Sequence, residues 1–174
     1  ADVNKAFCRM TKNAMDDAIG KSIFDMTDES SRRFLYANRE EIVRKPYYDF
    51  ETSLVAGDGK LVPVLVHMNT LYGDADKIVG KMAFITDMTE HKRALLLAGE
   101  VQKSLLPREA PKLQGLDIAG KMIPCDEIGG DYFDFMAHPE DRVDSFTVVV
   151  GDISGHGVEA SLLMATARAS LRRR

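Results

Sequence analysis

Hydrophobic residues follow two different spacings in the first half of the chain. Apolar residues three to four positions apart predict three short helices, over residues 4–11, 14–19 and 30–43. Runs rich in β-branched and aromatic residues predict three strands, over residues 50–55, 61–68 and 78–86. Gly57-Asp58-Gly59 lies between the first two strands and is typical of a hairpin turn. We therefore expect short helices followed by a three-stranded antiparallel sheet.

Near residue 88 the hydrophobic spacing changes from two to about 3.6 residues. Asp87 and Glu90 have the spacing of a capping box, which predicts the start of a helix, and Pro107 predicts its end. One face of this helix carries a stripe of apolar residues, namely Ala94, Leu97, Ala98, Val101 and Leu105. We expect an amphipathic linker helix over 89–107. Its stripe is buried either in a helical contact between two copies of the chain or against its own domain.

The second half again has the pattern of strands followed by a helix. Three strands are predicted, over residues 116–123, 130–136 and 146–153. The helix predicted from residue 158 onward is apolar over a wide arc, so it needs a larger partner than three strands supply. This predicts a truncated second domain. Arg172-Arg173-Arg174 is expected to be a solvated helix end.

Composition narrows the classes of function. The chain has 174 residues, of which 45% are hydrophobic and 29% charged, as in ordinary globular proteins. A net charge of −4 argues against a nucleic-acid partner. Cys8 and Cys125 do not form a zinc-binding or paired pattern, which favours a reducing compartment. No apolar run approaches the ~20 residues that span a bilayer. We expect a cytoplasmic protein, with no membrane contact in this part.

Two glycine-rich segments place an aspartate at the end of a predicted strand, Asp131 in the first and Asp152 in the second. Two carboxylates brought together repel each other unless a cation lies between them, and oxygen ligands favour Mg²⁺ or Mn²⁺ over zinc. Strand alternation places Asp131 and Asp134 on opposite faces, so they are not expected to share one ion. The alternative is that each aspartate only forms a turn or cap. Neither segment has the pattern of a P-loop or a Rossmann phosphate loop.

Three motifs of the second half resemble the start of the RsbU/SpoIIE-type PPM protein phosphatases. They are residues 100–107 (EVQKSLLP), 128–134 (IGGDYFD) and 151–157 (GDISGHG), in that order. The resemblance implies a β-sandwich with a flanking helix and a metal-dependent serine/threonine phosphatase with two Mn²⁺ or Mg²⁺ ions. A metal-activated water then attacks the phosphoryl group, and no protein nucleophile is needed.

The same resemblance implies roles for individual residues. Asp131 and Asp152 are metal ligands, the backbone carbonyl of Ile153 is an additional ligand, and His156 is an acid or positioning group. The family carries further metal-binding aspartates in its C-terminal half, which lie beyond Arg174. We therefore expect an incomplete metal site and no catalytic activity in this chain alone.

Residues 3–93 resemble the later part of a PAS sensor domain. The resemblance is carried by residues 3–7, 20–21, 57–60 and 87–93. It starts at the second strand of the family, so one or two N-terminal strands of the five-stranded PAS sheet are expected to be missing. The resemblance implies ligand sensing, dimerisation or both, and it leaves the ligand unknown. Cys8 does not lie in the photoreactive motif of flavin-binding members and is expected to be structural.

Together these patterns predict an α+β chain with a PAS-like sensor domain (1–88), a linker helix (89–107) and the N-terminal part of a PPM phosphatase domain (108–174). We interpret it as part of a bacterial-type signalling phosphatase that is regulated by a PAS sensor and forms a homodimer. The family resemblance suggests a phosphoprotein substrate, a phosphorylated anti-sigma-factor antagonist of the STAS type. The alternative is a non-catalytic PAS sensory and dimerisation module.

Overall fold

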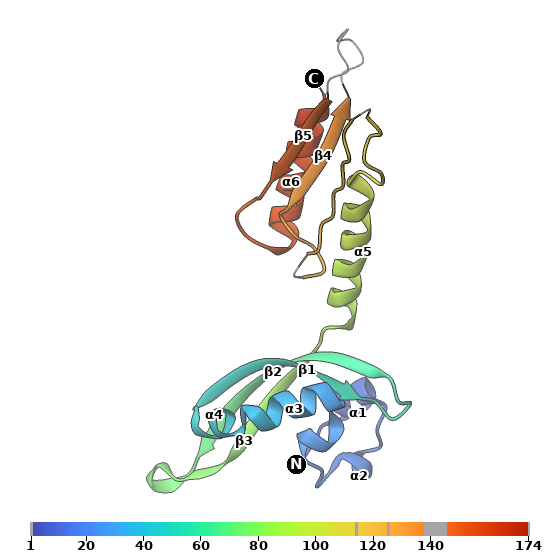
Figure 1. The fold of residues 1–174 in the computed structure, drawn as a ribbon. Coiled ribbons are helices and arrows are strands. Elements are labelled where there is room, and N and C mark those ends of the chain that lie inside the picture. Colours follow the sequence, from blue (N-terminus) through green and yellow to red (C-terminus); the bar gives the residue numbers. More distant parts are fainter. Residues whose placement is uncertain (1, 114, 125, 138–145, 174) are drawn as a thin grey trace. The chain divides into compact units, whose positions relative to one another are not determined.

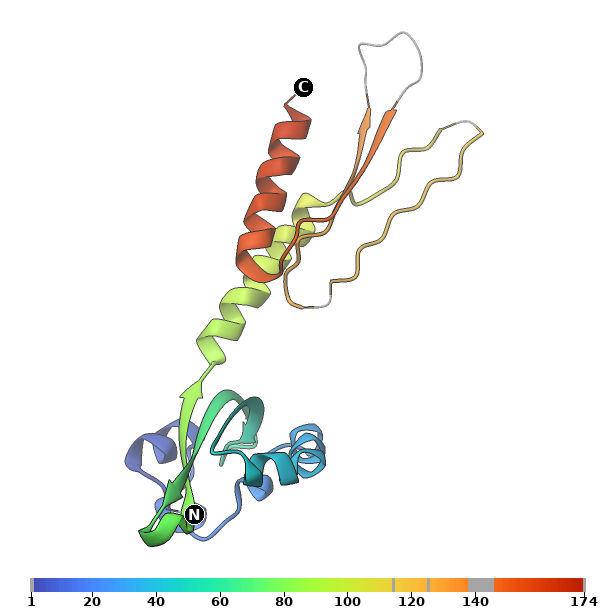
Figure 2. The same ribbon diagram turned by 90° about the vertical axis from the view of Figure 1, so that its left-hand side faces the viewer.

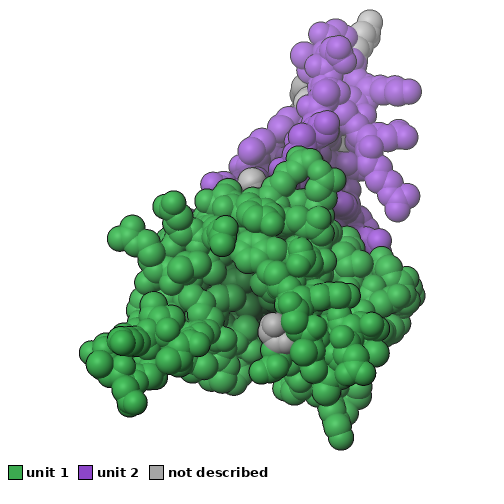
Figure 3. All heavy atoms as spheres, turned by 90° about the horizontal axis from the view of Figure 1, so that it is seen from below, with its two compact units in different colours: residues 1–92 green, residues 93–174 purple. Residues whose placement is uncertain are grey.

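The structure is a computed structural model that describes residues 2–113, 115–124, 126–137 and 146–173. Cys125 and Arg174 of the sequence interpretation lie outside these ranges. The chain divides into two compact units, residues 1–92 and residues 93–174 (Figure 3). Among the described helices, none is both long and apolar enough to cross a membrane.

Short capped helices form the first part of the first unit. They are α1 (Lys5–Thr11), α2 (Met15–Ala18), the 3₁₀ helix η1 (Ile23–Met26), α3 (Glu29–Ala37) and α4 (Arg39–Arg44). The N–H of Phe7 donates to Oδ1 of Asn4 at the start of α1 (2.9 Å). Asp28 caps α3, and hydrogen bonds from Ser30 and Ser31 lower its pKa.

The prediction of one continuous helix over residues 30–43 is wrong in one respect. Asn38 interrupts it, with a backbone conformation outside the helical range, and separates α3 from α4. The side-chain amide and the backbone N–H of Asn38 both donate to the carbonyl of Phe34, at 2.8 and 3.0 Å. Asparagine competes for backbone groups in this way and therefore ends helices despite a continuous apolar pattern.

The predicted antiparallel sheet is confirmed. It has the strand order β1 (Tyr47–Val55), β2 (Leu61–Tyr72) and β3 (Ile78–Asp87), with the 3₁₀ turn η2 (Asp74–Asp76) before β3 (Figure 1). Thr52 pairs with Val64, and Val66 pairs with Ile85. Gly59 has a φ of +78° in the hairpin turn between β1 and β2, a conformation that favours glycine.

One face of the sheet and the helices share a hydrophobic core. Alternate residues of β1 and β2 are buried there, and each helix from α2 to α4 contributes at least one buried side chain. The fully or nearly buried members are Ala18, Met26, Leu35, Ile42, Phe50, Leu54, Val64, Val66 and Met68. This shared core joins the helices to one face of the sheet.

The predicted linker helix is present as α5 (Thr89–Leu105). The N–H of Thr89 donates to Oδ1 of Asp87 (2.8 Å), so Asp87 caps the first turn as its position predicted. The helix ends two residues before Pro107, which cannot continue a helical hydrogen-bond ladder.

The second unit contains a two-stranded antiparallel sheet, β4 (Tyr132–Ala137) with β5 (Phe146–Gly151), and the helix α6 (Gly157–Arg172) beside it (Figures 1 and 2). Its small core is formed by Ile128, Tyr132, Ala160 and Met164, all at most 4% exposed. The chain thus has the mixed helix and sheet architecture that the sequence predicted.

The strand predicted over residues 116–123 is not formed. This segment is irregular apart from an isolated bridge between Leu113 and Leu116. A period-two apolar pattern requires a neighbouring strand with which to pair, and β4 pairs only with β5 among the described residues. The backbone at Gly120 instead packs closely against the ring of Phe133, which a Cβ at this position would overlap.

Candidate functional site

Asp131 and Asp152 lie directly beyond the paired ends of β4 and β5. The last pair of the ladder is Tyr132 with Gly151, so these two aspartates are the next two positions of the same register. Residues opposite each other in an antiparallel pair project to the same side of the sheet. The structure therefore brings the two carboxylates, which are 21 positions apart in the sequence, to one end of the sheet.

Both aspartates line one open pocket of about 480 Å³. Its polar wall includes Lys121, and its apolar wall includes Met122, Phe133 and Val150. Two carboxylates and a free opening to solvent are suited to bind a hard divalent cation through oxygen ligands. Among the described residues, no group of three or more metal-ligating side chains is found.

The segment after Asp152 turns sharply into α6. Gly155 and Gly157 have φ values of +108° and +77°, which a residue with a side chain adopts only at a cost, and His156 occupies the N-cap position between them. The His156 side chain is 89% exposed, and its Nδ1 atom lies 4.0 Å from Oδ2 of Asp126. His156 is therefore accessible to a molecule at this end of the sheet.

Gly130 allows the two glycine-rich segments to approach each other closely. A Cβ on Gly130 would overlap the carbonyl oxygen of Ile153 and would lie 3.2 Å from the Cβ of Ala160. The carbonyl that the family resemblance implies as a metal ligand thus faces the backbone immediately before Asp131. Glycine at position 130 is needed for packing rather than for an unusual φ.

The two faces of β4 carry different chemistry, as the alternation predicted. Phe133 and Phe135 make an edge-to-face contact on one face, with ring centroids 5.7 Å apart. On the other face, the hydroxyl of Tyr132 donates to Oδ2 of Asp134 (2.6 Å). Asp134 is therefore turned away from the pocket that Asp131 lines.

Asp134 is fully buried and its carboxylate has a complete set of donors. Arg172 donates through Nε to Oδ2 and through Nη2 to Oδ1, both at 2.6 Å. Burial alone would raise the pKa of Asp134, but the hydrogen bonds from Arg172 and Tyr132 outweigh it and lower this pKa to about 2. Burial and the bond to Asp134 raise the pKa of Tyr132 to about 12. The expectation that Arg172 is a solvated helix end is wrong.

The linker helix contacts the loop before Asp131 through two residues, Gly99 and Gln102. A Cβ on Gly99 would overlap the carbonyl oxygen of Glu127. Gln102, which is 4% exposed, donates through Nε2 to the carbonyl of Gly129 and accepts from the N–H of Gly129 (3.1 Å). We call this the α5 docking contact. It fixes the backbone two residues before Asp131.

Burial of the apolar stripe of α5 against its own domain, one of the two alternatives, is only partial in the single chain. Leu97 and Val101 are each 62% exposed and Ala94 is exposed, whereas Ala98 and Leu105 are half-buried. The face of α5 that carries Gly99 and Gln102 lies roughly a quarter turn around the helix from the apolar stripe. A close approach to a loop backbone needs a small residue and an amide, which an apolar pattern does not reveal. The signal of this contact in the sequence is a glycine and a glutamine three residues apart.

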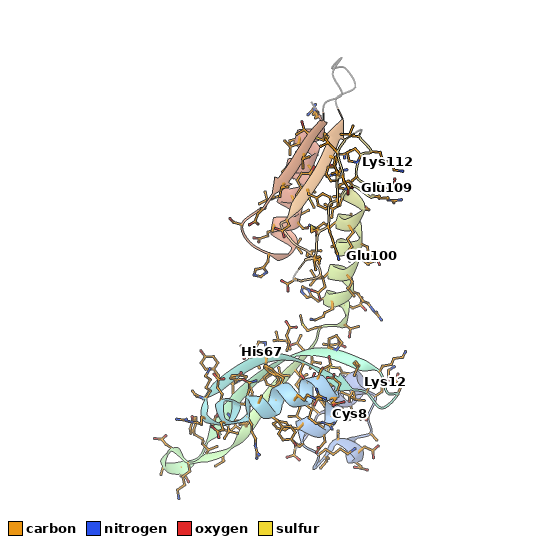
Figure 4. All side chains as sticks on the ribbon, viewed as in Figure 1. Cys8, Lys12, His67, Glu100, Glu109 and Lys112 are labelled. Atoms are coloured by element: carbon orange, nitrogen blue, oxygen red, sulfur yellow. The ribbon has the colours of Figure 1, made fainter. Side chains whose placement is uncertain are left out.

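In the first unit, chemically active side chains are dispersed (Figure 4). Cys8 is a free, half-buried thiol on α1. Lys12 pairs with Asp58 of the β1–β2 turn (2.7 Å), and Nδ1 of His67 lies 3.0 Å from Oδ1 of Asp49. These contacts tie α1 to the hairpin and β2 to β1, so they have a structural explanation.

Comparison with known proteins finds one domain family and one curated relative that match parts of the chain. The family model described as PAS domain matches residues 1–90. The phosphoserine phosphatase RsbU of Bacillus subtilis (strain 168) is 32% identical to this chain over 75 residues. That alignment covers 43% of this chain and 21% of RsbU, so the chain spans about a fifth of the length of this curated relative.

Two solved structures are similar to part of the chain. A PAS domain of a protein from Colwellia psychrerythraea matches at 17% identity and a TM-score of 0.47, covering 51% of this chain and 76% of that one. A Rhodobacter sphaeroides LOV protein matches at 14% identity and a TM-score of 0.44, covering 59% of this chain and 61% of that one.

Proposed function

This chain belongs to the PAS domain family, and from that premise we propose that its PAS domain regulates a metal-dependent protein serine/threonine phosphatase of the PPM type. The similarity to RsbU, whose name is phosphoserine phosphatase, supports the enzyme class. In this proposal residues 1–88 are the sensor, 89–107 the linker helix and 108–174 the N-terminal part of the phosphatase domain.

The observation that carries the proposal is the shared position of Asp131 and Asp152 at one end of the β4–β5 sheet. Consecutive positions in the register and a common pocket give one site two carboxylates, which fits Mg²⁺ or Mn²⁺. When bound, such an ion lowers the pKa of a water molecule and neutralises charge on a phosphoryl group.

The residues of this chain have separate tasks in that reaction. Asp131 and Asp152 hold the cation, and the backbone carbonyl of Ile153 is the proposed additional ligand. His156, exposed at the N-cap of α6, moves a proton or positions the substrate. Two metal ions are proposed for a complete phosphatase domain, in which residues other than Asp131, Asp152 and Ile153 supply the remaining ligands.

Regulation is proposed to pass through α5. The α5 docking contact joins the linker helix to the backbone of Gly129, and Asp131 follows two residues later. A signal in the PAS domain that rotates or shifts α5 therefore changes the loop that holds a metal ligand. The sequence of the sensor does not indicate which ligand the PAS domain binds.

The substrate is proposed to be a phosphorylated anti-sigma-factor antagonist of the STAS type, in the cytoplasm of a bacterial cell. This proposal rests on the similarity to RsbU and on the family resemblance of the motifs around Asp131 and Asp152. A net charge of −4 supports a protein substrate over a nucleic acid.

A phosphatase assay tests the proposal directly. The full-length protein is expected to hydrolyse a phosphoserine peptide in the presence of Mn²⁺, whereas residues 1–174 alone are expected to have negligible turnover. The reason is that a two-metal hydrolase needs both ions to produce hydroxide and to neutralise the phosphoryl charge. Robust turnover by residues 1–174 would contradict the incomplete site, and an inactive full-length protein would favour a non-catalytic sensory module.

A homodimer is proposed to cover the apolar stripe of α5, because Leu97 and Val101 are exposed in the single chain. Val101→Asp is expected to dissociate this dimer, since it would place an unpaired charge in an apolar helical contact. Sedimentation velocity of the wild type and the variant measures the change. Lys103→Asp, on the opposite side of α5, is the control and should leave the dimer intact. A wild-type chain that stays monomeric at high concentration would exclude the dimer.

A further inference from the structure

The pocket lined by Asp131 and Asp152 also has a cationic side chain, Lys121, to which neither the sequence patterns nor the comparisons assign a role. Lys121 is exposed, and no ion pair to it is found among the described residues. It comes from the irregular segment 116–123, which precedes the first glycine-rich motif (128–134) in the chain.

The packing of this segment explains how Lys121 comes to line the same pocket as the two aspartates. Gly120 lies against the rings of Phe133 and Phe135, because a Cβ at position 120 would overlap or crowd both rings. These rings project from the face of β4 to which Asp131 also belongs by alternation. The chain therefore crosses that face at Gly120, and Lys121 follows at the rim of the pocket.

We propose that Lys121 is a substrate-binding residue that contacts the phosphate of a phosphomonoester held at the Asp131 and Asp152 site. This inference rests on the proposed phosphatase function. A cation bound by two carboxylates leaves a dianionic phosphate with uncompensated negative charge, and an ammonium group at the same pocket supplies charge and up to three hydrogen-bond donors. The apolar neighbours Met122 and Val150 lack donors, so Lys121 is the cationic group of this wall.

The test measures binding, which does not require a complete catalytic site. A fluorescein-labelled phosphoserine peptide is titrated with residues 1–174 in the presence of Mg²⁺ and followed by fluorescence anisotropy. The same peptide without phosphate measures binding that does not depend on the phosphate. Lys121→Gln is expected to weaken binding of the phosphopeptide by about tenfold, the size of one charge-assisted hydrogen bond. Lys121→Arg is expected to retain most of the affinity.

Two controls separate this inference from the proposed function. Lys112→Gln removes the same charge from an exposed position that does not line this pocket (Figure 4) and is expected to leave binding unchanged. Asp152→Asn is expected to abolish the Mg²⁺ dependence of binding, whereas Lys121→Gln is expected to keep Mg²⁺ affinity, measured by calorimetry, at the wild-type value.

Each outcome then has one interpretation. Suppose that metal-dependent binding of the phosphopeptide is lost in Asp152→Asn but has the wild-type affinity in both Lys121→Gln and Lys112→Gln. This result would overturn the role of Lys121 and would leave the phosphatase proposal standing. Binding that is independent of both Mg²⁺ and Asp152 would overturn the phosphatase site, and with it the role of Lys121.

Discussion

Asp152→Asn in the full-length protein is expected to lower Mn²⁺-dependent turnover by several orders of magnitude, because it removes an anionic ligand from the ion that activates water. Residues 1–174 carrying the same substitution are expected to lose Mn²⁺ affinity in electron paramagnetic resonance titrations. Ligand binding by the PAS domain should be unchanged, since the substitution lies in the other unit.

The effect of Asp152→Asn on stability distinguishes a metal ligand from a turn residue. Two carboxylates that are close enough to share one ion repel each other without it, so under the ligand role neutralising Asp152 is expected to leave the melting temperature unchanged or to raise it. A turn or cap role predicts the opposite, a loss of about 1 kcal/mol. Asp117→Asn, an exposed position in the same unit, is the control for the loss of one charge. A destabilised Asp152→Asn variant with wild-type turnover would exclude the ligand role.

Asp134→Asn is expected to destabilise the second unit by about 2 to 3 kcal/mol, because it breaks a buried ion pair and leaves polar groups without their partners. The Arg172 side chain is 42% exposed and regains water, which keeps the loss below that of a fully buried pair. Amide hydrogen exchange of β4, followed residue by residue, measures the change.

The same carboxylate makes stability depend on pH. The folded pKa of Asp134 is lowered from 3.8 to about 2, so its contribution is present above pH 4 and is lost as the pH falls towards 2. This contribution is about 2 kcal/mol. The wild type is expected to lose that stability in this window, whereas Asp134→Asn should not. Equal acid sensitivity of the wild type and the variant would contradict the assignment.

The elements with local causes could be predicted from the sequence. The strands of the first unit follow from β-branched runs and a glycine turn, and α5 follows from the cap at Asp87 and the stop at Pro107. The division of residues 30–43 into two helices was missed, because the amide of Asn38 competes for a backbone carbonyl only when the geometry is known.

Contacts between residues that are distant in the sequence could not be predicted from sequence patterns. Arg172 and Asp134 are 38 positions apart, and an arginine at a helix end has the same pattern whether it is solvated or paired. Gln102 binds a backbone group of Gly129, and a backbone acceptor has no signature in the sequence. The apolar pattern of 116–123 shows a capacity to pair, but pairing needs a neighbouring strand that the described chain does not provide.

The α5 docking contact gives the linker helix a single angular setting. The helix contains one glycine and one glutamine, Gly99 and Gln102, and no other pair at this spacing combines a missing side chain with a side-chain amide. A slide of one turn or a rotation of a quarter turn would present a bulky residue to the carbonyl of Glu127 and would remove both hydrogen bonds to Gly129 at once. The helix therefore has one docked orientation, because any other orientation satisfies neither its backbone partner nor its own buried amide.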